Sequence, residues 1–157
     1  MFAVSVETEF RASHQLVLSD GSTEDAHDHN WRVLAEVSSE RLNDAGLVMD
    51  FERLKSAIDN IVAQFENKPL NTIDYFRRHN PSAENVAKYV YEKLELELPG
   101  GLGLEHITVV EEPNCSARFT KGSGRFGENG QIQSGLAETP NVKPTNNLQG
   151  PVKFDDI

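Results

Sequence analysis

Three of the five histidines in this 157-residue chain have a spacing suited to binding a metal ion. His27 and His29 are two residues apart at the start of an alternating stretch, so in a strand both imidazoles point to one face. His14 follows an earlier alternating stretch. If the two strands pair antiparallel, all three imidazoles converge, and they then fit tetrahedral Zn²⁺ with a fourth position open, the catalytic pattern. The alternative is a chance His-x-His pair without a ligand role.

Two carboxylates have spacings that suit them to the same site. Glu24 lies three residues before His27 and can act as a general base beside a metal; the alternative is a solvated loop acid. Glu111 shares the alternation of Ile107 and Val109, and a carboxylate on an apolar strand face is costly unless it is paired. It can bind a ligand that offers two parallel N–H donors. The alternative for Glu111 is an exposed acid at the end of a strand.

The strands that must position these residues are indicated by apolar alternation with a period of two. The first strand buries Val4, Val6 and Phe10 on one side, and the second starts near Asn30. Two later strands meet at a turn formed by Pro113. The four expected strands cover about residues 2–10, 30–37, 104–112 and 115–119.

Two helices are expected between the two pairs of strands. One follows Asp50 as N-cap and runs to about Phe65, and the other follows Ser82 and runs to about Leu94. Residues 66–81 form the connection between them. The order β-β-α-α-β-β segregates strands from helices, which predicts an α+β fold with an antiparallel sheet and both helices on one face.

Length and charge limit the possible classes of protein. The chain carries a formal charge of −10, which disfavours a nucleic-acid partner, and no run of residues is apolar and long enough for a membrane span. Its one cysteine excludes an internal disulfide and fits a cytoplasmic location. Residues 121–157 have no net charge and are rich in Gly, Pro and Asn, a composition typical of a linker or disordered tail. We therefore expect a domain at 1–120 and an extension at 121–157.

Six short motifs occur in the order and spacing of one protein family. The motifs are FRASH at 10–14, HDHNW at 27–31, LVMDF at 47–51, PLN at 69–71, NPSAEN at 80–85 and VVEEPNCSARF at 109–119. On these motifs, over about residues 2–120, the chain resembles the 6-pyruvoyl- and 6-carboxytetrahydropterin synthases.

This resemblance implies a fold, a cofactor and a set of site residues. The family has a β-β-α-α-β-β tunnelling-fold unit whose trimers form barrels, usually as hexamers, with active sites at subunit interfaces. His14, His27 and His29 match its zinc ligands. Glu111 matches the glutamate that anchors the 2-amino and N3 edge of the pterin, and Ser82 falls near the pterin pocket. The implied partners are a dihydroneopterin-type small molecule and further copies of the chain.

The chain departs from the usual family members at the proton-relay positions. Thr23 stands where they have a cysteine, and Glu66-Asn67 stands where they have an Asp-His pair. Asp28 replaces the glycine of the His-Gly-His motif. A threonine is a poor base at neutral pH and an asparagine side chain does not titrate, so the synthase mechanism cannot simply be carried over.

Glu24 offers one substitute for the missing relay. The pattern Glu-x-x-His-x-His resembles a subgroup in which Glu replaces the cysteine and the enzyme cleaves the dihydroneopterin side chain to 6-hydroxymethyldihydropterin, a retro-aldol step of folate synthesis. Glu66 or His79 can partly replace the Asp-His pair, although an exposed loop position explains His79 equally well.

Three functions remain open at this point. The first is a zinc-dependent lyase that cleaves the dihydropterin side chain with Glu24 as base. The second is 6-carboxytetrahydropterin synthase of the queuosine pathway, or pyruvoyl chemistry, acting on dihydroneopterin triphosphate with a rebuilt relay. The third is a pterin-binding homologue without catalysis.

Overall fold

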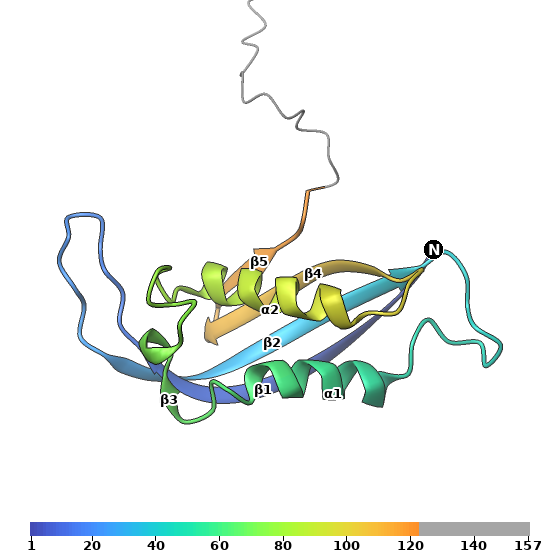
Figure 1. The fold of residues 1–157 in the computed structure, drawn as a ribbon, viewed down its shortest axis with the longest axis horizontal. Helices are drawn as coiled ribbons and strands as arrows, with labels where there is room; N and C mark the ends of the chain where they lie inside the picture. The colour runs from blue at the N-terminus through green and yellow to red at the C-terminus, as the bar shows by residue number, and fades with distance from the viewer. Residues whose placement is uncertain (123–157) are drawn as a thin grey trace, which may run out of the picture. The chain divides into compact units, whose positions relative to one another are not determined.

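Two long strands form the centre of the sheet (Figure 1). The computed structural model describes residues 1–122, so the predicted extension at 121–157 lies almost wholly outside the described residues. The strands pair antiparallel from Phe2 opposite Ser39 to His14 opposite His27. The sheet order is β3-β1-β2-β4-β5, with β1 (Phe2–His14), β2 (His27–Ser39), β4 (Gly103–Glu112) and β5 (Cys115–Phe119) as its antiparallel part.

Both helices lie on one face of this sheet, as predicted (Figure 1). Helix α1 (Phe51–Val62) begins after Asp50, whose side chain accepts the backbone N–H of Arg53 at 3.0 Å. Helix α2 (Ala83–Glu97) begins after Ser82, whose side chain accepts the N–H of Asn85 at 3.4 Å. Each cap satisfies an N–H group that has no partner inside the helix, and both predicted caps are confirmed.

The connection between the helices contains structure that alternation did not indicate. A two-residue strand β3 (Lys68–Pro69) pairs parallel to β1 and is followed by a 3₁₀ turn η1 (Leu70–Thr72), so the sheet is mixed and not purely antiparallel. The backbone N–H of Asn67 donates to the carbonyl of Arg11 at 2.7 Å and starts this pairing. Two residues are too few to leave a period-two pattern, which explains why β3 was not expected.

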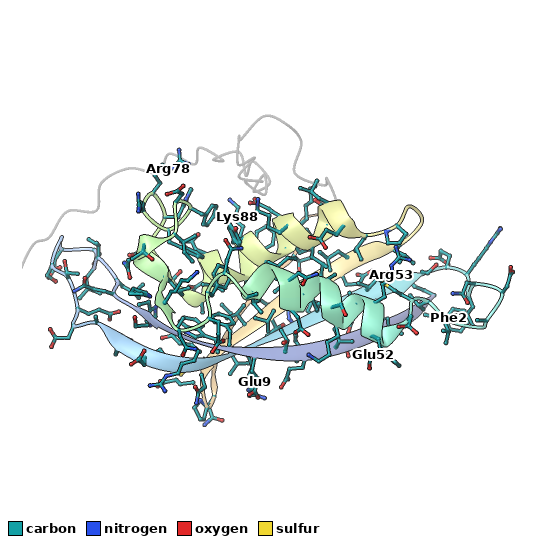
Figure 2. The ribbon with its side chains drawn as sticks, turned by 60° about the horizontal axis from the view of Figure 1, so that its bottom comes forward. Phe2, Glu9, Glu52, Arg53, Arg78 and Lys88 are labelled. Carbon is teal, nitrogen blue, oxygen red and sulfur yellow. The ribbon has the colours of Figure 1, made fainter. Side chains whose placement is uncertain are left out.

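The core lies between the sheet and the helices. Figure 2 shows Glu9 on the opposite face of the sheet, where the strand residues that alternate with the core are exposed. The largest fully buried side chains of the core include Trp31, Phe65, Leu54, Ile58, Leu94 and Ile107.

No helix in the described part of the chain is long and apolar enough to cross a membrane.

A polar contact between β1 and α1 gives a prediction about stability. The hydroxyl of buried Thr8 donates to the carboxylate of Asp59, and Lys55 contacts the same carboxylate at 3.0 Å. Burial opposes ionisation of Asp59, but the Thr8 hydroxyl and Lys55 outweigh it and hold the pKa of Asp59 below its ordinary value. Asp59→Ala is therefore expected to lower the free energy of unfolding by about 1 kcal/mol near neutral pH.

The pH dependence of this loss follows from the direction of the shift. Because the folded pKa of Asp59 is the lower one, its contribution is complete above the unfolded pKa and is lost as pH falls through the folded pKa. Urea unfolding at neutral and acidic pH should show the gap between wild type and Asp59→Ala closing in acid. Asp44→Ala, in an exposed loop, is the control. An equal gap at both pH values would contradict the assignment.

Candidate metal centre and active site

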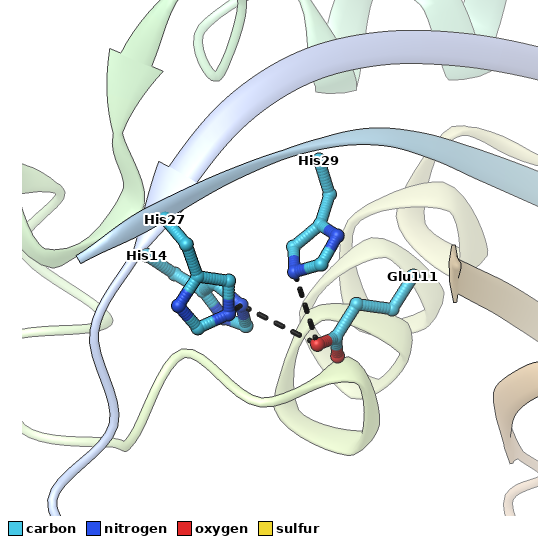
Figure 3. Close-up of side chains that lie close together, drawn as sticks. All are labelled: His14, His27, His29 and Glu111. Atoms are coloured by element: carbon cyan, nitrogen blue, oxygen red, sulfur yellow. Dashed lines mark hydrogen bonds and ion pairs between the residues drawn. The ribbon is translucent and has the colours of Figure 1, made fainter. Parts of the chain in front are cut away.

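The strand register brings three histidines together at one end of the sheet. His14 and His27 are direct cross-strand partners, and His29 lies two residues along β2 opposite Ala12, so all three point to the helix-covered face. The Nε2 atoms of His14 and His27 are 3.0 Å apart. Together with Glu111, the three rings offer ligand atoms within 4.8 Å of one another (Figure 3). The convergence predicted from the sequence is therefore present.

Hydrogen bonds to backbone carbonyls fix the tautomer of two of the imidazoles, those of His14 and His27. The Nδ1 atom of His14 lies 2.8 Å from the carbonyl of Pro81, and that of His27 lies 2.8 Å from the carbonyl of Asp25. A carbonyl only accepts hydrogen bonds, so each Nδ1 carries the proton and each neutral ring keeps a lone pair on Nε2. Two lone pairs that face each other at 3.0 Å repel unless a cation lies between them. This donor arrangement fits a metal ion such as Zn²⁺.

His29 completes the set of ring nitrogens. Its Nε2 is buried without a hydrogen-bond partner among the described residues, which fits a nitrogen whose role is to bind a metal ion. Burial lowers the pKa of His29; Glu111 opposes this, while His14 and His27 act in the same direction as burial. This direction favours the neutral ring, which is the form that binds metals.

Trp31 packs against two rings of the cluster, a role that the sequence did not indicate. Its fully buried ring makes edge contacts with His14 and His29, at 4.9 and 5.6 Å between ring centroids. Its indole N–H donates to the carbonyl of Ala12 at 3.1 Å and fixes the ring. The available signal was its position two residues after His29 on the same strand face.

Glu111 reaches the cluster from β4, where it shares the strand face of Ile107 and Val109, and the strand carries a bulge at this residue. Val110 pairs with Ser116 and Glu112 with Cys115, which leaves Glu111 as the extra residue. Bulges re-aim side chains and are frequent beside active sites. The Oε1 atom of Glu111 lies 3.4 Å from the Nε2 atoms of both His14 and His29 (Figure 3). Its carboxylate can serve either as a fourth metal ligand or as an anchor for a ligand beside the metal.

Glu24 lies at the edge of the same cluster. Its Oε1 atom is 4.0 Å from Nε2 of His27 and accepts the backbone N–H of Leu16 at 3.0 Å. Its Oε2 atom has no hydrogen-bond partner among the described residues and remains available to a substrate. Thr23, the residue at the position of the family's cysteine, is exposed, and its backbone forms an isolated β-bridge with Val17.

A cavity of about 400 Å³ lies next to Glu111. It is bounded by the start of α2, including Ser82 and Glu84, and by the turn into β5, including Cys115. No lysine or arginine of the described residues lines it, so one chain offers this cavity acids but no cations. It is suited to a ligand with N–H donors.

Two other predicted residues have contacts outside the cluster. The carboxylate of Glu66 accepts the backbone N–H of Arg11 at 3.1 Å and the side-chain amide of Asn67 at 3.0 Å. His79 stacks on Tyr75, with ring centroids 4.3 Å apart, and its Nδ1 lies 2.9 Å from the Tyr75 carbonyl. Within one chain the structure brings neither residue to the histidines, and their relay roles stay predictions.

The comparison with known proteins decides the family. A family model described as 6-pyruvoyl tetrahydropterin synthase matches residues 3–122. The chain belongs to this family. A 6-carboxy-5,6,7,8-tetrahydropterin synthase of Synechocystis sp. is 32% identical over 124 residues, covering 76% of this chain and 93% of the relative. A dihydroneopterin monophosphate aldolase of Pyrococcus furiosus is 31% identical over 102 residues, covering 65% and 82%.

The fold is also that of the 6-pyruvoyl tetrahydropterin synthase family. The solved structure of the Caenorhabditis elegans 6-pyruvoyl tetrahydropterin synthase aligns with a TM-score of 0.65 at 23% identity, and the match covers 78% of this chain and 98% of that one. The resemblance and the α+β fold predicted from the sequence are thus confirmed. The relatives carry out synthase and aldolase reactions of pterin metabolism, so the family alone does not choose between the two reactions for this member.

Proposed function

We propose that this chain is a zinc-dependent lyase that cleaves the side chain of a dihydroneopterin-type substrate to 6-hydroxymethyldihydropterin and works as a cytoplasmic homo-oligomer. The observation that carries the proposal is the Glu24 carboxylate, 4.0 Å from His27 in a three-histidine cluster. A carboxylate with one free oxygen at this place is a suitable base for a side-chain hydroxyl. The Pyrococcus furiosus aldolase among the relatives supports cleavage as the reaction.

In this proposal His14, His27 and His29 hold the zinc ion. Their neutral rings, with protons on Nδ1 of His14 and His27, fit this role. When bound, the metal polarises the side-chain oxygens of the substrate. The carbonyls of Pro81 and Asp25 orient the rings of His14 and His27, and the ring of Trp31 packs against His14 and His29.

Glu24 moves the protons of the cleavage. Its carboxylate removes the proton from the C2′ hydroxyl of the substrate, the C1′–C2′ bond breaks, and C2′ leaves as the aldehyde carbon of glycolaldehyde. The electron pair of the broken bond passes into the C6–N5 imine of the pterin ring, which becomes an enamine. Protonated Glu24 then returns the proton to C1′, which restores the imine and yields the 6-hydroxymethyl product. No oxidant or reductant is needed.

Glu111 is proposed to anchor the pterin ring. Its carboxylate borders the 400 Å³ cavity and can accept two parallel N–H groups from the 2-amino and N3 edge. Ser82 lines the same cavity and is the N-cap of α2. In this proposal the pterin ring lies on one side of the cluster and its side chain extends toward Glu24.

Glu111→Gln separates the anchor role from a role as metal ligand. An amide of the same size presents only one acceptor oxygen without charge, so we expect dihydroneopterin binding to weaken by at least roughly tenfold. Zinc content, measured by atomic absorption, should stay at the wild-type level, and isothermal titration measures the pterin. Loss of zinc in this variant would make Glu111 a metal ligand and overturn the anchor role.

The Synechocystis relative supports 6-carboxytetrahydropterin synthesis as the second candidate. Product analysis separates side-chain cleavage from 6-carboxytetrahydropterin synthesis. Zinc-loaded protein is incubated with dihydroneopterin and, in parallel, with its triphosphate, and the products are identified by mass spectrometry. We expect 6-hydroxymethyldihydropterin from dihydroneopterin. A 6-carboxy or 6-pyruvoyl product from the triphosphate alone would favour the second candidate. Zinc and pterin binding without turnover of either compound would indicate a binding protein.

A further inference from the structure

Two asparagine side chains hold the backbone on either side of Leu16. Asn71 accepts the N–H of Gln15 at 3.0 Å and donates to the carbonyl of the same residue at 2.8 Å. Asn80 does the same for Val17, at 2.9 and 2.8 Å. Each amide thus replaces a neighbouring strand, and only one orientation of each amide satisfies both bonds.

The segment held in this way carries Glu24. The N–H of Leu16 donates to Oε1 of Glu24, the N–H of Glu24 donates to the carbonyl of Leu16 at 3.1 Å, and the side chain of Gln15 donates to the carbonyl of Glu24 at 2.8 Å. Three hydrogen bonds therefore join Glu24 to two residues. Of those two residues, Gln15 is itself held by Asn71, and Leu16 lies between Gln15 and Val17, the two residues that the asparagines hold.

We propose that Asn71 and Asn80 are positioning residues that hold the Glu24 carboxylate at the histidine cluster. The proposal rests on the function proposed above, in which Glu24 is the base. Both asparagines belong to the connection between the helices, and this connection also supplies the Pro81 carbonyl that orients His14. The connection between the helices thus fixes the position of Glu24, the proposed base, relative to His14, a proposed metal ligand.

The loop that contains Glu24 depends on such outside support. Residues 15–26 join β1 to β2, and within the loop the only bridge of the described structure is the one between Val17 and Thr23. The tip, around Asp20 and Gly21, is exposed. The two sides of the loop pair with each other, through this bridge and the bond from Glu24 N–H to the Leu16 carbonyl, and Asn71 and Asn80 tie the paired segment to the connection between the helices. A displacement of about 1 Å can lower a catalytic rate about 100-fold.

Asn71→Leu and Asn80→Leu remove the hydrogen bonds and keep the side-chain size. In the zinc-loaded protein we expect each to lower kcat for dihydroneopterin cleavage by about 100-fold, with KM within about twofold and zinc content unchanged. Asn43→Leu is the matched control, because Asn43 accepts the backbone N–H groups of Ala45 and Leu47 in the loop before α1. This control should lose stability without losing kcat.

A double-mutant cycle tests whether Asn71 acts through Glu24. In a Glu24→Gln background, Asn71→Leu should lower the remaining kcat by less than about twofold, because the base that it positions is already gone. The same large factor in both backgrounds would overturn the proposal. So would loss of zinc from Asn71→Leu, since the asparagine would then act through the metal ligands.

Amide hydrogen exchange gives a measurement that does not need activity. In zinc-bound Asn71→Leu, the Leu16 amide should exchange at least roughly tenfold faster than in wild type, while Asn43→Leu leaves it unchanged. Unchanged exchange at Leu16 would overturn the positioning role. The wild type could fail to cleave any dihydropterin while the Leu16 amide still exchanged faster in Asn71→Leu. The proposed function would then be wrong, but the positioning of Leu16 and Glu24 by Asn71 would stand.

Discussion

His14→Ala is expected to reduce the zinc content from about one ion per chain to close to none. His14 is the most buried of the three histidines, contacts both of the others by ring edges, and shares the 3.0 Å Nε2 contact with His27. In the proposal Glu111 binds the pterin and not the metal, so removing His14 leaves two ligands where a catalytic zinc site needs three. Atomic absorption on protein purified with zinc measures the change.

The same substitution should abolish stabilisation by zinc. At a zinc concentration about 100-fold above Kd, a ligand that binds only the folded state adds about 2.7 kcal/mol, and this increment should vanish in His14→Ala. His106→Ala is the control, because His106 lies on β4 near Glu36 and outside the cluster. A His14→Ala protein that kept stoichiometric zinc would contradict the ligand assignment.

Glu24→Gln is expected to lower kcat for side-chain cleavage by about 10²- to 10⁴-fold, the usual contribution of a general base. The glutamine oxygen can still accept the N–H of Leu16, so the loop keeps its position, but the amide cannot take a proton. Zinc content and KM should change little. Steady-state assays with dihydroneopterin measure both constants.

Asp25→Asn is the matched control for this change. Asp25 is the adjacent acid and is exposed, and it orients His27 through its backbone carbonyl and not through its side chain. Its kcat should stay within about twofold of wild type. Full activity in Glu24→Gln would show that another group removes the proton.

Local patterns were enough to predict the elements that are long or capped. Alternation predicted β1, β2, β4 and β5, and the caps Asp50 and Ser82 set the starts of both helices. The meeting of His14 with His27 followed from the antiparallel pairing of two strands whose ends were already indicated. These features depend on side chains close in sequence or on a single strand pairing.

Features that depend on contacts between distant segments could not be predicted. The bonds of Asn71 and Asn80 join residues 56 and 63 positions apart, and no periodic pattern marks them. The bulge at Glu111 appears only in the pairing of β4 with β5. Trp31 looked like an ordinary core residue, because its contact with His14 and His29 depends on how three rings pack.

The central claim is that this chain breaks the C1′–C2′ bond of a dihydroneopterin side chain with Glu24 as base. The most direct measurement is the amount of glycolaldehyde released for each dihydroneopterin consumed by the zinc-loaded protein, with Glu24→Gln assayed in parallel. We predict glycolaldehyde and 6-hydroxymethyldihydropterin in equal amounts from wild type and almost none from the variant. Consumption of dihydroneopterin without glycolaldehyde, or equal release by both proteins, would contradict the account.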